Sequence, residues 1–575
     1  MMNIVGIVDN HSASVAMVKD GELLAAHQEE RPTRLKNKGG FPAAALKDLV
    51  VSTGIELADV DLFTFSTNYY LYPGLESRND VFSMYDLAFD RDVPGRSDKA
   101  SRKGSDERGI KEQQADRASK LISLGVPKDK IIFVEHHTCH AAAAYYGMAN
   151  FDDDILVFTC DGQGDQSSAT AWLGSKGKME QFLSVDKGHS LGQIYTYITY
   201  LLGLVPLEHE YKLMGLAPYA EESKGANEVK KIIQKYFVFD NEGDPKWRRS
   251  ATDILGHSAA PQLARDLEFR RFDEIAGGVQ LFIEETVVHW IERLINLTGA
   301  KKVALSGGVF MNVKLNKLIM EMPQIEELFI FPSCGDESNS IGAAWYTSQQ
   351  HRFVKEEFTG IGPLYLGSTP SDDDIELAIE KFAFTSKVQI KRVDNIEQQC
   401  AQILAEGGIV GRFSGRGEFG ARALGNRSIL ADPRKWATVH RINRAIKMRD
   451  FWMPFAPAIR QEDAEKLFVN KDKFHAPYMV MAFDTTAEGQ LHMPAAVHPN
   501  DQTCRPQVVQ REFNPNFHEL LTAFADLTGY GAVLNTSFNL HGEPLVETPT
   551  DALDVFNRSG LDVLAIGSWL ISKDK

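Results

Sequence analysis

Short apolar runs that end at acidic or glycine-containing turns recur in this chain, and they constrain its fold more than any other feature. The turns are Asp161–Asp165, Ser306–Gly308 and Pro332–Asp336, and the runs before them are Ile155–Cys160, Val303–Leu305 and Leu328–Phe331. Runs of this length suit buried strands, and helical patterns follow the second and third turns. Repeated units of strand, turn and helix predict an α/β fold.

The first residues of the chain predict a β-hairpin. Asn3–Val8 reads as a strand that the polar bend Asp9–Ser12 interrupts and Ala13–Val18 resumes, and Asp20-Gly21 makes a hairpin turn before Glu22–His27. A hairpin with polar residues at its first bend is how actin-like ATPase domains begin. Residues 69–120 are polar, with few periodic apolar positions, so we expect an irregular insertion there that forms a lid over the site.

The length of 575 residues exceeds what one hydrophobic core serves, so more than one domain is expected. A loop-rich stretch marks the boundary, with glycines and prolines at positions 360, 362, 363, 367 and 370. We therefore predict a first domain at 1–355, a linker at 356–373 and a second domain at 374–575.

Composition excludes several classes of protein. The formal net charge of −16 argues against a surface that binds nucleic acid. The five cysteines form no CxxC pair, which excludes zinc-ribbon modules and suits a reducing cytoplasm. No basic and apolar leader or long apolar run is present, so we expect no signal peptide, no membrane span and a cytoplasmic location.

A histidine pair gives the first candidate site. His136 and His140 are four residues apart, before the helix-forming run Ala141–Ala144, so they share one helix face on which two imidazoles can hold one ion. His137 lies on another face. The acid at Asp161 follows the strand Ile155–Cys160, a common place for metal chemistry. The spacing alone also fits a capped helix with surface histidines.

Two glycine-containing segments give candidate phosphate sites. Gly307 and Gly308 separate a strand from a helix start, which lets backbone N–H groups approach a phosphate or an adenosine. Residues 414–428 hold three arginines among glycines, and arginine forks match phosphate oxygens. The basic pair Lys447 and Arg449, with polar groups at 535–539, could hold a triphosphate. The alternative for residues 414–428 is an ion-paired surface loop.

Together these stretches resemble one family, the O-carbamoyltransferases of the nodulation and antibiotic type. The resemblance extends from His11 to Leu564, and its most specific stretches are His136–His140, Lys212–Tyr219, Gly420–Arg434, Phe455–Pro457 and Asn535–Pro549. It implies an N-terminal actin-like (ASKHA) domain of the ATPase type and a C-terminal YrdC-like α/β domain.

The resemblance also implies a reaction in two steps. In the YrdC-like domain, carbamoyl phosphate and ATP would give carbamoyl-adenylate and pyrophosphate. In the actin-like domain, a hydroxyl of a small-molecule natural product would attack the carbamoyl carbon, and AMP would leave. The implied partners are this acceptor and the two co-substrates. Charge and composition predict no nucleic acid and no membrane as partners, and a homodimer is one of the open oligomeric states.

Residue roles follow from the same resemblance. The implied metal ligands are His136, His140, Asp161 and Asp336, and this set suits iron(II) first, with manganese or zinc as alternatives and magnesium accompanying ATP. His11 would be the general base, with Lys36 in the same site. In the second domain Lys447 and Arg449 would be catalytic. The residues implied to bind nucleotide or carbamoyl-adenylate are Gly162, Gly164, Gly307, Gly308, Asn312, Arg422, Arg505, Asn535, Ser537 and Asn539.

One position departs from the family pattern. Met453 stands where the family commonly has an arginine, and a methionine cannot reproduce an arginine fork at phosphate. If that arginine holds carbamoyl phosphate, its role falls to another cation such as Arg449 or Arg460. A tRNA threonylcarbamoylating enzyme and a nucleotide-binding regulator with an impaired donor step remain as alternatives. The acceptor, the metal and the oligomeric state are open.

Overall fold

The computed structural model describes residues 2–70, 76–89, 107–239, 246–249, 260–351, 354–471 and 474–574. The chain forms two compact units, of which the first contains Met1–Glu29 and Asn37–Ile361 and the second contains Glu30–Lys36 and Gly362–Lys575. The later boundary falls inside the loop-rich segment 356–373. The short excursion into the second unit was not predicted, because helix α1 (Glu30–Thr33) is too short to give a periodic pattern.

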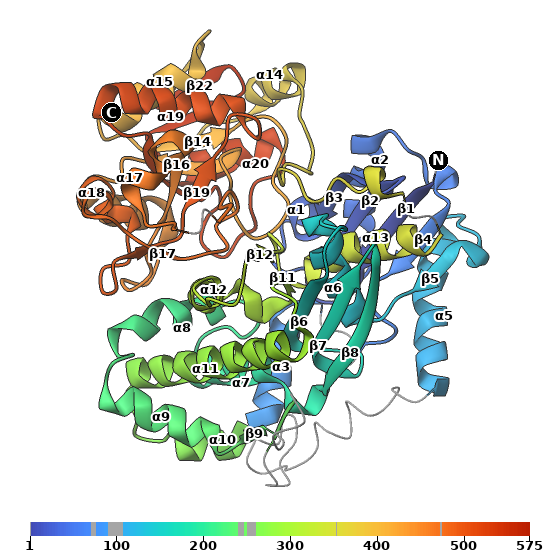
Figure 1. The fold of residues 1–575 in the computed structure, drawn as a ribbon. Coiled ribbons are helices and arrows are strands. Elements are labelled where there is room, and N and C mark those ends of the chain that lie inside the picture. The colour runs from blue at the N-terminus through green and yellow to red at the C-terminus, as the bar shows by residue number, and fades with distance from the viewer. Residues whose placement is uncertain are drawn as a thin grey trace. The chain divides into compact units, whose positions relative to one another are not determined.

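Two five-stranded sheets in the first unit repeat one topology (Figure 1). Each begins with three antiparallel strands, and two further strands continue in parallel from the first. Their orders are β3-β2-β1-β4-β5 and β8-β7-β6-β11-β12. The bounds are β1 (Asn3–Val8), β2 (Ser14–Lys19), β3 (Glu22–Gln28), β4 (Leu62–Phe65), β5 (Ile131–Phe133), β6 (Ile155–Gly164), β7 (Ser167–Ser175), β8 (Lys178–Asp186), β11 (Lys302–Ser306) and β12 (Glu327–Ile330).

The last helix of each half lies between the two sheets. Helix α6 (His136–Met148) packs on β6 and β11, helix α13 (Asn339–His351) packs on β1 and β2, and the two helices pack on each other. Close approach needs glycine: a Cβ on Gly342 would lie 1.9 Å from the Cys139 carbonyl oxygen, and one on Gly6 would lie 1.8 Å from that of Ser340. This duplicated arrangement is the actin-like fold that the sequence predicted.

The remaining helices of the first unit lie mainly between β8 and β11 in the sequence. They include the long helix α11, which packs against α9 across Gly277 and Gly278. The bounds are α2 (Ala43–Thr53), α3 (Arg78–Phe89), α5 (Glu107–Ser123), α7 (Leu191–Leu201), α8 (Glu210–Leu216), α9 (Lys224–Gln234), α10 (Ala260–Asp266), α11 (Phe272–Thr298) and α12 (Val313–Met320).

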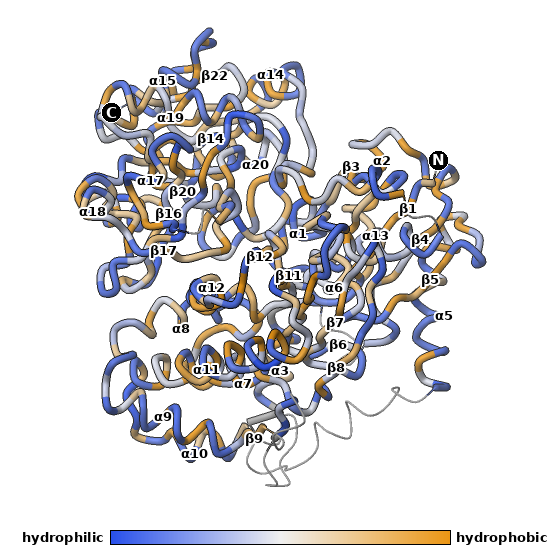
Figure 2. The backbone as a smooth tube through the Cα atoms, viewed as in Figure 1, coloured by the Kyte–Doolittle hydropathy of each residue, from blue (hydrophilic) through white to orange (hydrophobic). Residues whose placement is uncertain are grey.

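The prediction of an irregular insertion at 69–120 is wrong where the structure describes it. Residues 78–89 form α3 and residues 107–123 form α5, while residues 71–75 and 90–106 lie outside the described ranges. Helix α5 is mainly hydrophilic in Figure 2, and its buried residues are Arg117, Ala118 and Leu121. Arg117 is buried through an ion pair with Asp9 at 2.8 Å, so the helix shows little apolar periodicity. Within the described ranges, no helix combines the length and hydropathy of a membrane span.

The second unit is built on one eight-stranded mixed sheet in the order β13-β22-β21-β14-β15-β20-β16-β19. Side chains of its central strands belong to two hydrophobic cores, one on each face of the sheet. Val410 and Leu430 pack in the core that contains residues of α15 and α19, and Phe413 and Ile429 pack in the core that contains residues of α14 and α20. The strands are therefore buried on both faces. The α/β class predicted for this part is confirmed.

The elements of the second unit are the following. Its helices are α14 (Asp372–Lys381), α15 (Ile396–Ala405), α16 (Ala437–Ile442), α17 (Ala464–Leu467), α18 (Ala487–His492), α19 (Pro515–Thr528) and α20 (Pro549–Arg558). The strands of the sheet are β13 (Val388–Arg392), β14 (Val410–Phe413), β15 (Arg427–Ala431), β16 (Ala456–Arg460), β19 (Gln507–Val509), β20 (Ala532–Ser537), β21 (Val563–Ile566) and β22 (Trp569–Lys573).

Candidate metal centre and phosphate site

The two predicted histidine ligands lie in the first turns of α6. Glu135 caps this helix by accepting a hydrogen bond from the Thr138 N–H at 2.7 Å, and the alanine run that follows favours the helix. His136 and His140 are therefore one turn apart, and both are buried. The helix start fixes the direction of both imidazoles.

One of the two acidic residues lies in the last part of β6, and the other lies in the segment after β12. Strand β6 runs through Gly164 rather than ending at Cys160, so Asp161 lies within an irregular part of its ladder with β7. Its Oδ1 atom accepts a hydrogen bond from the Gly308 N–H at 2.9 Å. Asp336 begins a short 3-10 turn after β12. Four candidate ligands, two imidazoles and two carboxylates, from three separate segments thus meet at one place.

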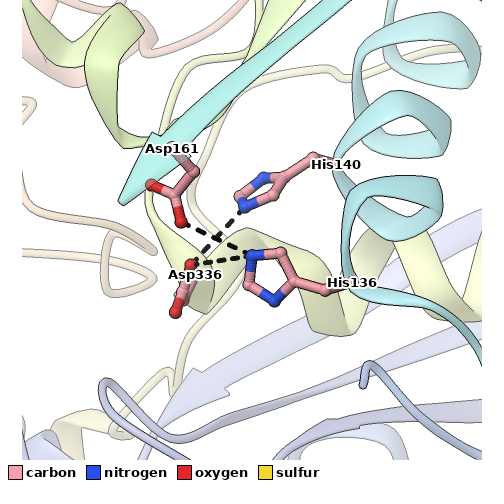
Figure 3. A group of neighbouring side chains, drawn as sticks. All are labelled: His136, His140, Asp161 and Asp336. Carbon is pink, nitrogen blue, oxygen red and sulfur yellow. Dashed lines mark ion pairs between the residues drawn. The ribbon is translucent and has the colours of Figure 1, made fainter. Parts of the chain in front are cut away.

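Figure 3 shows the four side chains pointing toward one another. His136 Nε2 lies 3.4 Å from Asp161 Oδ2 and 3.5 Å from Asp336 Oδ1. His140 Nε2 lies 3.4 Å from the same Asp336 oxygen. One ligand atom of each residue lies within 4.8 Å of every other.

The ionisation of this group reflects its burial and its crowded charges. Burial alone would lower the pKa of His136, but Asp336 and Asp161 outweigh it and raise this pKa to about 10. Burial and the neighbouring His136 lower the pKa of His140 to about 3. Burial and the Asp161 carboxylate raise the pKa of Asp336 to about 6. Two carboxylates and two imidazoles therefore compete for shared protons.

The donor set fits a divalent cation. The Nε2 atoms of His136 and His140 are buried and have no hydrogen-bond partner in the described structure. Ligands at about 2.1 Å from a tetrahedral ion are about 3.4 Å apart, which matches the three measured separations of 3.4–3.5 Å. Imidazole and carboxylate donors suit iron(II), manganese or zinc.

The two other histidines of interest have different surroundings. His137 has partners at both ring nitrogens, Thr159 Oγ1 at 2.7 Å and the Ser167 carbonyl oxygen at 3.1 Å, which explains why it stays outside the ligand group. His11 follows β1, and its Nδ1 lies 3.0 Å from Ser12 Oγ. A positive charge on His11 lowers the pKa of Asp336. The predicted base therefore lies near the four candidate metal ligands, which we call the metal group.

The glycines assigned to the nucleotide also have structural reasons to be glycine. A Cβ on Gly164 would lie 2.0 Å from His136 Cδ2, because the imidazole packs directly on this backbone. A Cβ on Gly307, which has φ +105°, would lie 2.4 Å from the Cys160 carbonyl oxygen, and one on Gly308 would lie 2.6 Å from Asp161 Oδ1. The nearest atom to a Cβ on Gly162 would be 3.5 Å away. A nucleotide contact at these positions stays a prediction.

Asn312 has a defined local role. Its side chain caps α12 by accepting from the Leu315 N–H at 3.1 Å, and its amide exchanges two hydrogen bonds with the Gln280 amide, at 2.9 and 3.1 Å. The helix start beside the Gly307–Gly308 turn is therefore fixed in place. The predicted contact of Asn312 with a nucleotide is not tested by these bonds.

The second unit holds a cluster of cations, which we call the cationic cluster: Lys36, Arg422, Lys447, Arg449 and Arg505. Burial, together with Arg449 and Lys36, lowers the pKa of Lys447 well below its ordinary value. Burial, together with Arg422 and Arg449, does the same to Arg505. Each of the neighbouring charges that cause these shifts is positive, so the cluster is suited to an anion of high charge.

Polar groups of β20 and the loop after it hold Lys447. Its Nζ donates to Ser537 Oγ at 3.0 Å and to Asn539 Oδ1 at 2.6 Å, so the predicted Ser537 and Asn539 contacts meet at this amine. Asn535 donates from its amide nitrogen to the Ala423 carbonyl oxygen and to Gln507 Oε1, both at 3.1 Å. Its Oδ1 is buried without a partner in the described structure.

The arginines of residues 414–428 divide into two groups. Arg416 donates to the Gly367 and Leu366 carbonyl oxygens, and Arg427 donates to those of Ser414 and Gly415. Arg427 is fully buried, and these bonds hold the loop itself. Burial of Arg427 does not fit the alternative of an ion-paired surface loop. Arg422 is the member of the three whose charge acts on Arg505, and a phosphate contact of these arginines stays a prediction.

Lys36 belongs to the second unit, where its charge acts on Lys447, and its predicted place in one site with His11 stays a prediction. The sequence could not show this because residues 30–36 stand between elements of the first unit. Sequence reasoning also gave no role to Asp165 or Thr67, which bond to each other beside the metal group at 3.0 Å. The second acid of Asp161–Asp165 was the only signal for them.

Comparisons with known proteins agree with both halves of this description. The family model for the carbamoyltransferase N-terminus matches residues 109–345, and that for the carbamoyltransferase C-terminus matches residues 401–573. Nodulation protein NolNO of Sinorhizobium fredii is 31% identical over 98% of this chain and 79% of its own length. The 3'-hydroxymethylcephem-O-carbamoyltransferase of Amycolatopsis lactamdurans is 29% identical over 46% of this chain and 48% of its own.

Among solved structures, component A of the (R)-2-hydroxyglutaryl-CoA dehydratase of Acidaminococcus fermentans aligns with 61% of this chain and 99% of its own, at 15% identity and a TM-score of 0.34. The assignment rests on the sequence matches, which cover both units, and on the nodulation relative, which covers nearly the whole chain. The chain belongs to the carbamoyltransferase family.

Proposed function

We propose that this enzyme is an ATP-dependent O-carbamoyltransferase that forms carbamoyl-adenylate in its second unit and transfers the carbamoyl group to a small-molecule hydroxyl in its first. The cationic cluster carries the proposal, because neighbouring cations lower the pKa values of the buried Lys447 and Arg505, and a polyanion would offset this crowding of positive charge. ATP with carbamoyl phosphate supplies that charge. The O-carbamoyltransferase relative supports a hydroxyl acceptor.

Atom balance divides the donor step into two parts. Carbamoyl phosphate and water give carbamate and inorganic phosphate, and a carbamate oxygen then attacks the α-phosphorus of ATP and releases pyrophosphate. Lys447 and Arg505 would stabilise the phosphate charge that develops. The unpartnered Asn535 Oδ1 offers an acceptor to the carbamate NH₂ group.

In the transfer step, His11 would accept the proton of the acceptor hydroxyl as that oxygen attacks the carbamoyl carbon. The carbon–oxygen bond to AMP then breaks. Four residues would hold a divalent ion, His136, His140, Asp161 and Asp336, and that ion would supply positive charge beside the departing AMP phosphate. The candidates for that ion are iron(II), manganese and zinc, and the transfer rate with each of them is to be compared.

A pyrophosphate assay without acceptor tests the donor step. The protein, ATP and carbamoyl phosphate should release pyrophosphate, and Lys447→Ala should reduce the rate by about 100-fold or more. The matched control is Arg434→Ala, since Arg434 is paired with Asp432 at 2.7 Å and is not part of the cationic cluster. His136→Ala should keep pyrophosphate release and lose transfer. Release that does not depend on carbamoyl phosphate would refute the proposal.

A further inference from the structure

The carboxylate of Asp165 lies behind the metal group, where no role in the reaction has been assigned to it. Asp165 is 3% exposed, and both of its oxygens accept hydrogen bonds. Oδ2 accepts from the His136 N–H at 2.8 Å. Oδ1 accepts from Thr67 Oγ1 at 3.0 Å and from the Asn68 N–H at 3.0 Å. One side chain thus joins the first turn of α6 to the loop after β4.

The backbone at Asp165 also makes specific contacts. Asp165 has φ +48°, a left-handed conformation that is unusual for a residue other than glycine. The Tyr69 hydroxyl donates to the Asp165 carbonyl oxygen at 2.7 Å, which fixes that conformation. The preceding residue, Gly164, lies directly beneath the His136 ring. Consecutive residues therefore contact the ring and the N–H of the same metal ligand.

The same network reaches the turn that carries His11. Arg117 donates to both carboxylate oxygens of Asp9, at 2.8 and 2.9 Å, and to the Thr67 carbonyl oxygen at 2.8 Å. Asp9 is two residues before His11. A continuous chain of hydrogen bonds therefore runs from Asp9 through Arg117, Thr67 and Asp165 to His136, and every member belongs to the first unit.

We propose that Asp165 is a positioning residue that sets the place of His136 within the metal centre and couples it to the turn of His11. A carboxylate suits this place because its side chain accepts each of its described hydrogen bonds and because it lies at the positive end of a helix. An asparagine has the same shape, but its NH₂ group would face a donor. The inference rests on the proposed metal centre and not on the identity of the acceptor.

Metal binding by purified, metal-free protein tests the inference, with Mn²⁺ as the probe in calorimetry and Co²⁺ as a spectroscopic reporter. Asp165→Asn should weaken Mn²⁺ binding by about 10- to 100-fold, as expected when a group that orients a ligand is lost. It should also shift the visible Co²⁺ spectrum. Asp153→Asn is the matched control: Asp153 is a surface acid paired with Lys302, and its variant should bind as the wild type does.

Thr67 provides a second, milder pair of variants in case Asp165→Asn folds poorly. Thr67→Val removes the hydroxyl at constant shape and should weaken Mn²⁺ binding, and Thr67→Ser should restore it. The positioning role would be overturned if the wild type binds Mn²⁺ and both Asp165→Asn and Thr67→Val bind it with an affinity within about 2-fold of the wild type. Their Co²⁺ spectra would then also match that of the wild type. Wild type that binds no better than Asp161→Asn would overturn the metal centre as well.

Discussion

At the scale of single residues, the contacts of Arg449 and Arg460 distinguish the two cations that the sequence offers in place of an arginine at Met453. Arg460 forms an ion pair with Asp463, whose side chain is 1% exposed. The Nη2 and Nε atoms of Arg460 lie 2.9 and 3.0 Å from Asp463 Oδ2. Arg449 donates to the Pro454 carbonyl oxygen at 3.2 Å and to Thr536 Oγ1 at 3.1 Å. Its charge also acts on both Lys447 and Arg505. Because its charge reaches both of these cations, we propose Arg449 rather than Arg460 as the cation that holds the donor.

We expect Arg449→Lys to lower kcat/KM for carbamoyl phosphate by about 10- to 100-fold, because a charged donor with a fork contributes about 1.5–3 kcal/mol. Arg460→Lys should stay within about 2-fold, since a lysine can still pair with Asp463. Steady-state pyrophosphate release measures both. Equal losses in the two variants would contradict the assignment.

The residues of the metal group could be predicted, whereas the residues around them could not. The spacing of His136 and His140 and the strand end at Asp161 are local patterns, and the family resemblance added Asp336. Asp165 and Lys36 depend on tertiary contacts between segments that are distant in sequence, and no period or motif encodes such contacts.

At the scale of elements, helix α11 carries a buried acid that makes stability depend on pH. Glu284 is 6% exposed and receives a hydrogen bond from Gln280 at 2.6 Å. Burial and the neighbouring Glu221 raise the pKa of Glu284 to about 8. Between about pH 4.5 and 8 the folded protein keeps a proton that the unfolded chain has released, so stability falls as the pH rises through this window.

The unfolding free energy of the wild type should therefore decrease by up to about 1.4 kcal/mol per pH unit from this group. Glu284→Gln cannot lose the proton, so its advantage over the wild type should grow between pH 5.5 and 8.5 in urea unfolding. Glu285→Gln, on the exposed face beside it, should change stability by the same small amount at both pH values. An advantage for Glu284→Gln that does not change with pH would contradict the origin of the effect.

Elements were predictable where burial follows a simple period. The strands β1, β6, β11 and β12 begin within one residue of their predicted starts, since continuous apolar runs mark buried strands. Helix α5 was missed because it is buried through Arg117 and not through an apolar face. Strand β6 was ended too early, because its last residues pair with β7 while carrying the acidic and glycine pattern of a turn.

At the scale of the whole molecule, the chain enters the second unit twice. Residues 30–36 and residues 362–575 belong to it, although β1–β3 and α2 on either side of the first segment belong to the other unit. Arg31 donates to the Gly420 carbonyl oxygen at 2.6 Å, and Arg34 donates to those of Leu545 and Pro544. The excursion therefore supports the two loops that lead into β15 and α20.

Arg34→Met should therefore destabilise the second unit by about 1–3 kcal/mol while leaving the sheets of the first unit intact, because buried carbonyl groups lose a charged donor. Amide hydrogen exchange measures this directly. Faster exchange is expected at residues 543–551 and in α20, with β1–β5 unchanged. Arg108→Met is the control, since Arg108 is an exposed residue of α5 paired with Glu112. Faster exchange in β1–β5 instead would show that residues 30–36 fold with their sequence neighbours.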